Sequence, residues 1–183
     1  NIKETTGEVI DIDNIPLDDK KTCEMLCAGD TYGVFQLESK GITKLVVDLA
    51  PESFEDLIPL VALYRPGPLG TGMAEDFIAG RHGHRTAEIL HPLMEPILKD
   101  TYGVILYQEQ VMQLTRALAG FTRGQSDNVR KAMGKKIIAM LDELEGKFYE
   151  GCEKEGTLDR ATAKDLWEKF KEFAKYAFNK SHA

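Results

Sequence analysis

The chain has 183 residues, 43% of them hydrophobic, and a formal net charge of −7 at pH 7. That length suffices for one ordinary hydrophobic core or two small ones. The overall acidity excludes a protein that coats nucleic acid through bulk positive charge, so any contact with a polyanion must be local. No apolar run approaches the roughly 20 residues that cross a bilayer, which predicts no membrane contact.

The first residue and the cysteines indicate the setting of the chain. It begins with Asn1 rather than Met and shows no signal peptide, and we expect a piece of a longer protein. Cys23 and Cys27 are one helical turn apart, which is not the spacing of a zinc knuckle, and the third cysteine makes their number odd. Reduced thiols in a cytoplasmic protein are therefore expected.

The N-terminal third of the chain carries the start and stop signals of helices. Asp18 or Asp19 provides a cap for a helix that Gly29 ends. Residues 31–37 are expected to form a short extended or irregular run, after which Ser39 caps a second helix to about residue 49. Ser53 and Asp56 then have the spacing of a capping box and predict a third helix.

Residues 65–68, with the sequence RPGP, are predicted to end that third helix, because two prolines and a glycine do not continue one. Short helices follow at residues 73–78 and 92–99. A longer one is expected from Val104 to about Ala119, since the apolar residues recur at helical spacing. Its apolar face holds Val104, Tyr107, Val111, Leu114 and Leu118.

Two further apolar stripes predict the last two helices. The first ends at Gly156 and is lined by Ile137, Leu141, Leu144, Phe148 and Cys152; the second is lined by Ala163, Trp167, Phe170, Phe173, Ala174 and Ala177. We interpret the aromatic residues of the second stripe as core rather than as a base-stacking platform. The predicted fold is all-α, an irregular arrangement of seven or eight helices with short loops and little or no sheet.

A basic stretch at residues 121–136, FTRGQSDNVRKAMGKK, stands out in this acidic chain. Five cations against one acid, Asp127, give it a local charge of +4, which leaves −11 for the rest. The cations are Arg123, Arg130, Lys131, Lys135 and Lys136. Such an island marks the place where an anion is expected.

A helix within this stretch would present its cations in rows. Ser126 is predicted as the N-cap, and Lys131 and Lys135 lie at i,i+4 spacing. This arrangement suits a ligand with several anionic oxygens, such as a triphosphate or a nucleic-acid backbone. The alternative is a solvated basic face without a ligand.

Several ordered strings together resemble one protein family. They are GVFQLES at residues 33–39, LVALYRPGPL at 60–69, TYGVILYQEQVM at 101–112, VRKAMGKK at 129–136 and FNKSH at 178–182. The chain from about Asp11 onward is similar to the alpha subunit of bacterial DNA polymerase III, the C-family replicative polymerase. The resemblance places it at the start of the fingers domain, with residues 1–17 as a linker after the palm and 18–183 as a C-terminally truncated, helical fingers segment.

The resemblance implies roles for individual residues. The nucleotide-binding residues it implies are Arg130, Lys131, Lys135, Lys136, Lys180 and His182. Where many members have two arginines, this chain has Arg130 followed by Lys131, so a planar fork is replaced by a point charge at the second position. Arg65, Arg123 and Gln108 are further candidates for contacts with phosphate or DNA.

The resemblance also implies partners and a limit. The expected partners are a deoxynucleoside triphosphate, a primed DNA template and, through the parent protein, other replicase subunits. The family's catalytic aspartates lie upstream in the palm, where Mg²⁺ would be bound, so Asp11 and Asp13 are interpreted as solvated carboxylates. We therefore predict a part of a DNA-directed DNA polymerase that is not catalytic alone, with no catalytic or metal-binding residue in this chain.

Other assignments stay open at this point. Arg65 follows a helix at a rigid turn, and is either a strut paired with a carboxylate or a phosphate contact. Tyr102, Tyr107, Gln108 and Gln110 lie near a turn, where they either pack or face a nucleotide. The rival function is a non-catalytic helical module that binds a nucleic-acid backbone through residues 123–136.

Overall fold

A computed structural model describes residues 1–135 and 137–183 of the chain. Within these ranges it contains eleven α-helices, five short 3-10 helices and no strand, apart from an isolated parallel bridge between Tyr107 and Phe178. The all-α prediction is confirmed. The predicted number of helices was too low, because helices of four to six residues carry too little periodicity to be found. No helix in the described ranges is long and apolar enough to span a membrane.

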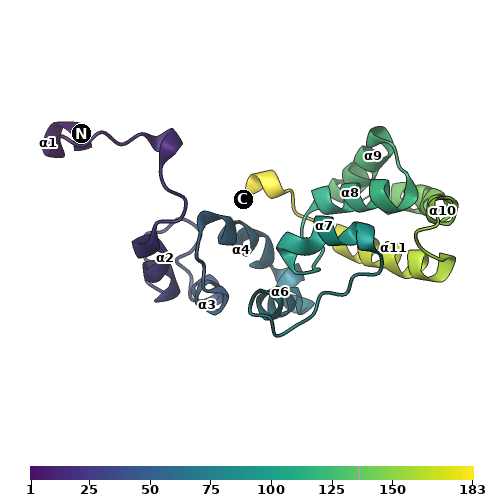
Figure 1. The fold of residues 1–183 in the computed structure, drawn as a ribbon, viewed down its shortest axis with the longest axis horizontal. Helices are drawn as coiled ribbons and strands as arrows, with labels where there is room; N and C mark the ends of the chain where they lie inside the picture. The colour runs from purple at the N-terminus through teal and green to yellow at the C-terminus, as the bar shows by residue number, and fades with distance from the viewer. Residues whose placement is uncertain (136) are drawn as a thin grey trace. The chain divides into compact units, whose positions relative to one another are not determined.

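The chain divides into two compact units, Asn1–Leu60 and Val61–Ala183 (Figure 1). The first unit contains the shorter helices of the N-terminal third, and α4 continues from it into the second. Its elements are α1 Ile2–Thr6, η1 Ile12–Asn14, α2 Lys20–Cys27, α3 Lys40–Leu49, η2 Phe54–Asp56 and the start of α4 Ile58–Leu63.

The predicted helix ends of the first unit are largely correct. Asp19 caps α2 by accepting the Thr22 N–H at 2.8 Å, and Gly29 follows the helix with φ of 77°. Ser39 precedes α3 as expected. A hydrogen bond between two hydroxyls holds the irregular run 31–37 to α3, since Thr31 Oγ1 lies 2.8 Å from Thr43 Oγ1.

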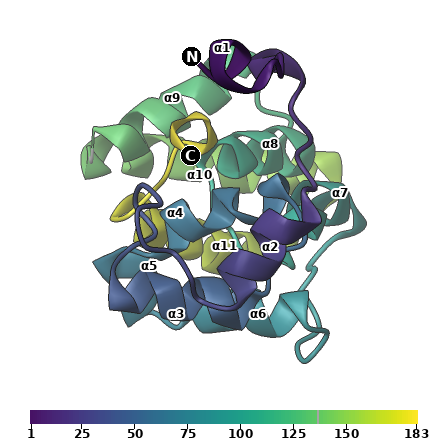
Figure 2. The same cartoon turned by 90° about the vertical axis from the view of Figure 1, so that its left-hand side faces the viewer.

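The second unit gathers its four longest helices into one bundle, in which α8 lies against α9 and α10, and α11 against α10 (Figures 1 and 2). Its elements are the end of α4, α5 Pro66–Gly70, α6 Met73–Arg81, η3 Pro92–Met94, α7 Glu95–Leu98, η4 Lys99–Thr101, α8 Gln108–Ala119, α9 Arg123–Gly134, α10 Ile138–Glu155, α11 Arg160–Ala174 and η5 Lys180–His182.

The core of this unit confirms the two predicted apolar stripes. Phe148 of α10 and Trp167 of α11 are fully buried, with ring centroids 4.9 Å apart. Phe170 and Phe173 are also buried, so the aromatic residues of α11 are core. Only the edges of the stripes differ: Ile137 precedes α10 and is half-exposed, and Ala177 lies beyond the end of α11.

The RPGP segment corrects one prediction. It follows the end of α4 as expected, but Pro66 is also the first residue of a new short helix, α5. Proline is favoured at the first helical position, because its missing N–H would have no intrahelical partner there and its φ already suits a helix. The same residues that end one helix therefore begin the next.

The start of α8 corrects another prediction. Residues 104–106 have no regular secondary structure, Tyr107 is extended, and α8 begins at Gln108 rather than at Val104. The buried side chain of Gln110 explains the difference. Its Oε1 accepts the N–H groups of Leu106 and Tyr107 at 2.8 and 3.0 Å. Its Nε2 donates to Thr101 Oγ1 at 2.7 Å and to the Ile97 carbonyl at 3.2 Å.

Replacing Gln110 with Leu is expected to lower the free energy of unfolding by about 2–4 kcal/mol, because two buried backbone N–H groups lose their acceptor. Urea unfolding followed by circular dichroism measures this loss. Gln113→Leu, at an exposed position of the same helix, is the matched control and is expected to change stability by less than about 0.5 kcal/mol. Equal effects of the two substitutions would contradict the role assigned to Gln110.

Two glycines of α10 provide a second test of the packing. A Cβ on Gly151 would lie 2.3 Å from the Ala119 carbonyl oxygen of α8, whereas one on Gly146 meets no atom within 4 Å. We expect Gly151→Ala to destabilise the protein by about 1–3 kcal/mol. Gly146→Ala is expected to stabilise it by about 0.5–1 kcal/mol, since glycine is a poor helix former. Thermal unfolding of the two variants should therefore shift in opposite directions.

Candidate functional site

The helix that carries the predicted cations, α9, begins earlier than expected. Its N-cap is Thr122, whose hydroxyl accepts the Gln125 N–H at 3.2 Å, while the Gln125 side chain accepts the Thr122 N–H at 2.8 Å. Ser126, the predicted N-cap, is buried inside the helix and donates to the Arg123 carbonyl. Thr122 and Gln125 have the T-x-x-Q pattern of a capping box, so the signal was present in the sequence.

The exposed side of α9 carries Arg130 and Lys131, because Val129, Ala132 and Met133 are buried on the opposite side. About a third of the Arg130 side chain and half of the Lys131 side chain are exposed. Both side chains are near the C-terminal end of the helix, where positive charge is favourable to the helix dipole. They are therefore held on a folded helix and remain accessible to a ligand.

Asp127 binds both cations within α9. Its Oδ1 accepts from Arg130 Nε at 2.9 Å and Nη2 at 2.8 Å, and its Oδ2 lies 2.8 Å from Lys131 Nζ. Lys131 and Arg130 hold the pKa of the Asp127 carboxyl below its usual range. The carboxylate is thus charged at neutral pH, and the group of three side chains has a net charge of +1.

The C-terminal residues lie against the start of α8 (Figures 1 and 2). The Gln108 N–H donates to the Phe178 carbonyl at 2.8 Å, and the Lys180 N–H donates to Glu109 Oε2 at 3.2 Å. The Lys180 ammonium lies 5.5 Å from the centre of the Tyr107 ring. The short helix η5, with Lys180 and His182, is therefore attached to α8 by backbone and side-chain contacts.

Arg65, near the start of the second unit in the sequence, binds the same C-terminal segment. Its Nε donates to the Ala62 carbonyl at 3.1 Å and its Nη2 to the Tyr176 carbonyl at 2.7 Å. Its guanidinium also lies 4.8 Å from the centre of the Phe178 ring. Arg65 is thus a strut bonded to backbone carbonyls rather than to the carboxylate or phosphate expected from the sequence, and burial lowers its pKa.

Gln108 connects these parts. A Cβ on Gly134, the last residue of α9, would lie 3.8 Å from Gln108 Nε2. The same residue donates its backbone N–H to Phe178. The C-terminal end of α9 and the segment around Phe178 therefore meet at the start of α8, although about 45 residues separate them in the sequence.

The other predicted site residues differ in their distance from this meeting point. Lys135 is exposed at the C-cap of α9, next to Gly134, and the ring of His182 lies 6.4 Å from that of Phe178. Arg123 is the first residue of α9, so a helix of this length places its backbone roughly 18 Å from Lys135. Lys136 lies outside the described residues.

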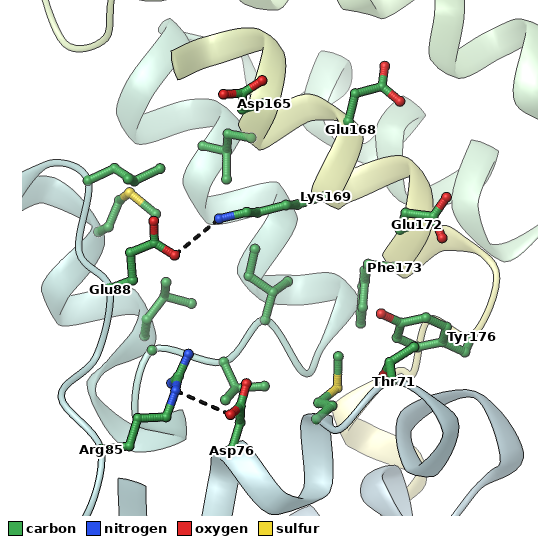
Figure 3. A pocket seen from close by; sticks show the side chains of 18 residues that line it. Thr71, Asp76, Arg85, Glu88, Asp165, Glu168, Lys169, Glu172, Phe173 and Tyr176 are labelled. Carbon is green, nitrogen blue, oxygen red and sulfur yellow. Dashed lines mark hydrogen bonds and ion pairs between the residues drawn. The ribbon is translucent and has the colours of Figure 1, made fainter. Parts of the chain in front are cut away.

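A cavity of about 530 Å³ in the second unit lies between α11 and the segment that leads from α6 to α8 (Figure 3). Lys169 pairs with Glu88 at 3.2 Å across it, and Arg85 pairs with Asp76 at 3.3 Å. Five acidic residues and two basic ones line this cavity. An anionic ligand would be repelled there, so the cavity is not the binding site for a triphosphate.

The acidic pair near the N-terminus shows no geometry of a metal site. Asp11 caps η1, because its Oδ1 accepts the Asp13 N–H at 3.1 Å and its Oδ2 accepts from Asn14 Nδ2 at 2.7 Å. No group of three or more His, Cys, Asp or Glu residues within the described ranges is arranged to hold a metal ion.

Comparison with known proteins identifies relatives along the whole chain. The family model of the "Bacterial DNA polymerase III alpha subunit finger domain" matches residues 1–156. A protein of Aquifex aeolicus called DNA polymerase III subunit alpha is 46% identical over 182 residues, which is 100% of this chain and 16% of that protein. Its namesakes in Pseudomonas aeruginosa and Escherichia coli K12 are 48% and 46% identical over 96% and 95% of the chain. The chain spans 15% of each of these two relatives.

Proposed function

We propose that this chain, which belongs to the family of bacterial DNA polymerase III alpha subunit finger domains, binds the triphosphate of an incoming deoxynucleotide within a larger polymerase. The observation that carries the proposal is the meeting of two basic segments. The end of α9, which carries Arg130, Lys131 and Lys135, lies beside the Gln108 side chain, and Phe178, in the segment before Lys180 and His182, accepts the Gln108 N–H. Two separate cationic segments at one place suit a ligand with several charged oxygens.

The chemistry of nucleotidyl transfer explains why such cations are useful. Charge develops on the non-bridging phosphate oxygens as pyrophosphate leaves, and positioned cations stabilise it. Arg130 offers a planar fork to two oxygens, while Lys131 provides a compact charge with rotatable donors. In our proposal the chain holds and neutralises the triphosphate, and primed DNA and other replicase subunits are bound through the parent protein.

Magnesium is assigned to another part of that protein. Mg²⁺ in nucleotidyl transferases requires carboxylates from the protein. The described residues do not fit such a site, because the Asp11 carboxylate is used to cap η1 and no suitable cluster occurs among them. We therefore propose that the chain is not catalytic on its own.

The isolated chain is expected to bind deoxynucleoside triphosphates weakly, because exposed cations give little net free energy against a solvated phosphate. Backbone amide shifts in an NMR titration should be confined to residues 123–136 and 180–182, and a triphosphate should bind more tightly than a monophosphate. The rival, a module that binds a nucleic-acid backbone, predicts preference for a DNA oligomer with a steep salt dependence. Shifts centred on residues 82–91 would contradict both functions.

The parent polymerase provides the sharper test, through Arg130→Ala. A charge-assisted hydrogen bond is worth about 1.5–3 kcal/mol, so kcat/KM for nucleotide incorporation should fall roughly ten- to a hundredfold. Affinity for primed DNA should stay nearly unchanged. Lys131→Arg, which keeps the charge, should change kcat/KM only slightly. An Arg130→Ala enzyme that binds primed DNA several-fold worse, but incorporates nucleotide normally at saturating DNA, would favour the rival.

A further inference from the structure

Asp127 is the acid of the basic stretch, and both of its carboxylate oxygens are bound to the cations that we assign to the triphosphate. Arg130 reaches Oδ1 through Nε and Nη2, and Lys131 reaches Oδ2. Asp127 is therefore placed to set the conformations of two cationic side chains at once.

The donors used in these contacts leave room for a second anion. A guanidinium has five N–H groups, and Asp127 accepts from Nε and from one hydrogen of Nη2. The edge formed by Nη1 and the second Nη2 hydrogen is the one that binds two phosphate oxygens side by side. The Lys131 ammonium has three donors, of which the contact with Asp127 uses one. A phosphate can thus bind both cations without displacing the carboxylate.

We propose that Asp127 is a positioning residue, which fixes Arg130 and Lys131 in the conformations that receive the triphosphate. The inference rests on the proposed function. Both side chains are long and have many rotamers, and binding would otherwise have to remove this conformational entropy. Because Lys131 and Arg130 keep the pKa of Asp127 below its usual range, the carboxylate holds its charge at neutral pH.

An electrostatic role and a positioning role of Asp127 predict opposite changes in nucleotide affinity when Asp127 is removed. If Asp127 merely opposes the triphosphate electrostatically, its removal raises the local charge by one and should tighten nucleotide binding. If Asp127 positions the cations, its removal frees them and should weaken binding, although the site becomes more positive. The sign of the change therefore decides between the two accounts.

Asp127→Asn in the parent polymerase provides this test. Single-turnover incorporation, measured over a range of nucleotide concentrations, should show a roughly three- to tenfold higher nucleotide Kd with little change in the maximal rate. Glu150→Gln, which removes one negative charge at an exposed position of α10, is the control and should leave Kd unchanged. A misfolded fraction of enzyme does not alter this Kd, because only folded enzyme contributes to the signal.

A double-mutant cycle shows whether Asp127 acts through Arg130. In the Arg130→Ala enzyme, Asp127→Asn should raise Kd much less than it does in the wild type. If Asp127→Asn does not fold at all, Asp127→Glu replaces it; the longer side chain moves the carboxylate, and we expect a rise in Kd in the same direction. A lower or unchanged Kd for these variants overturns the positioning role. Normal kinetics of Arg130→Ala itself would instead reject the proposed function.

Discussion

The buried amide of Gln110 is the interaction on which the geometry of the candidate site depends. It accepts two backbone N–H groups, from Leu106 and Tyr107, and donates to Thr101 and to the Ile97 carbonyl. These bonds keep residues 104–107 out of the helix, so that α8 begins at Gln108. Tyr107 and Gln108, where that run meets α8, bind Phe178, and through it the segment with Lys180 is placed. A fully satisfied buried polar group of this kind specifies one arrangement, because every alternative leaves a buried partner unpaired.

Basic and acidic side chains of the second unit gather at different places. Arg130 and Lys131 of α9 lie opposite its buried residues and near its C-terminal end, where Asp127 holds them without neutralising both. The cavity beside α11 is instead rich in carboxylates, and its cations Arg85 and Lys169 are paired (Figure 3). An acidic protein can therefore attract a polyanion at one place, because the potential that matters is local at physiological salt.

Local sequence signals predicted the structure correctly where a residue interacts with its neighbours in the sequence. Asp19 caps α2, Gly156 ends α10 in a left-handed conformation, and the apolar stripes of α10 and α11 face the core as their spacing predicts. They failed where two local signals competed. Val104 and Tyr107 have helical spacing with Val111, but the chain there is not helical. Ser126 resembles an N-cap, but Thr122 four residues earlier forms the complete capping box.

The order of amino acids was sufficient to predict the all-α class, the core of α10 and α11, the basic stretch and the resemblance to one polymerase family, because periodicity, charge and ordered motifs are properties of neighbouring residues. Which basic segments lie near Gln108 depends on the tertiary structure. It brings the end of α9 and the segment around Phe178 to Gln108, directs Arg65 to the carbonyls of Ala62 and Tyr176, and leaves Arg123 at the far end of its helix. These contacts join residues from 3 to 111 positions apart. No local pattern encodes the long-range ones, since they depend on where buried groups such as Gln110 find their partners.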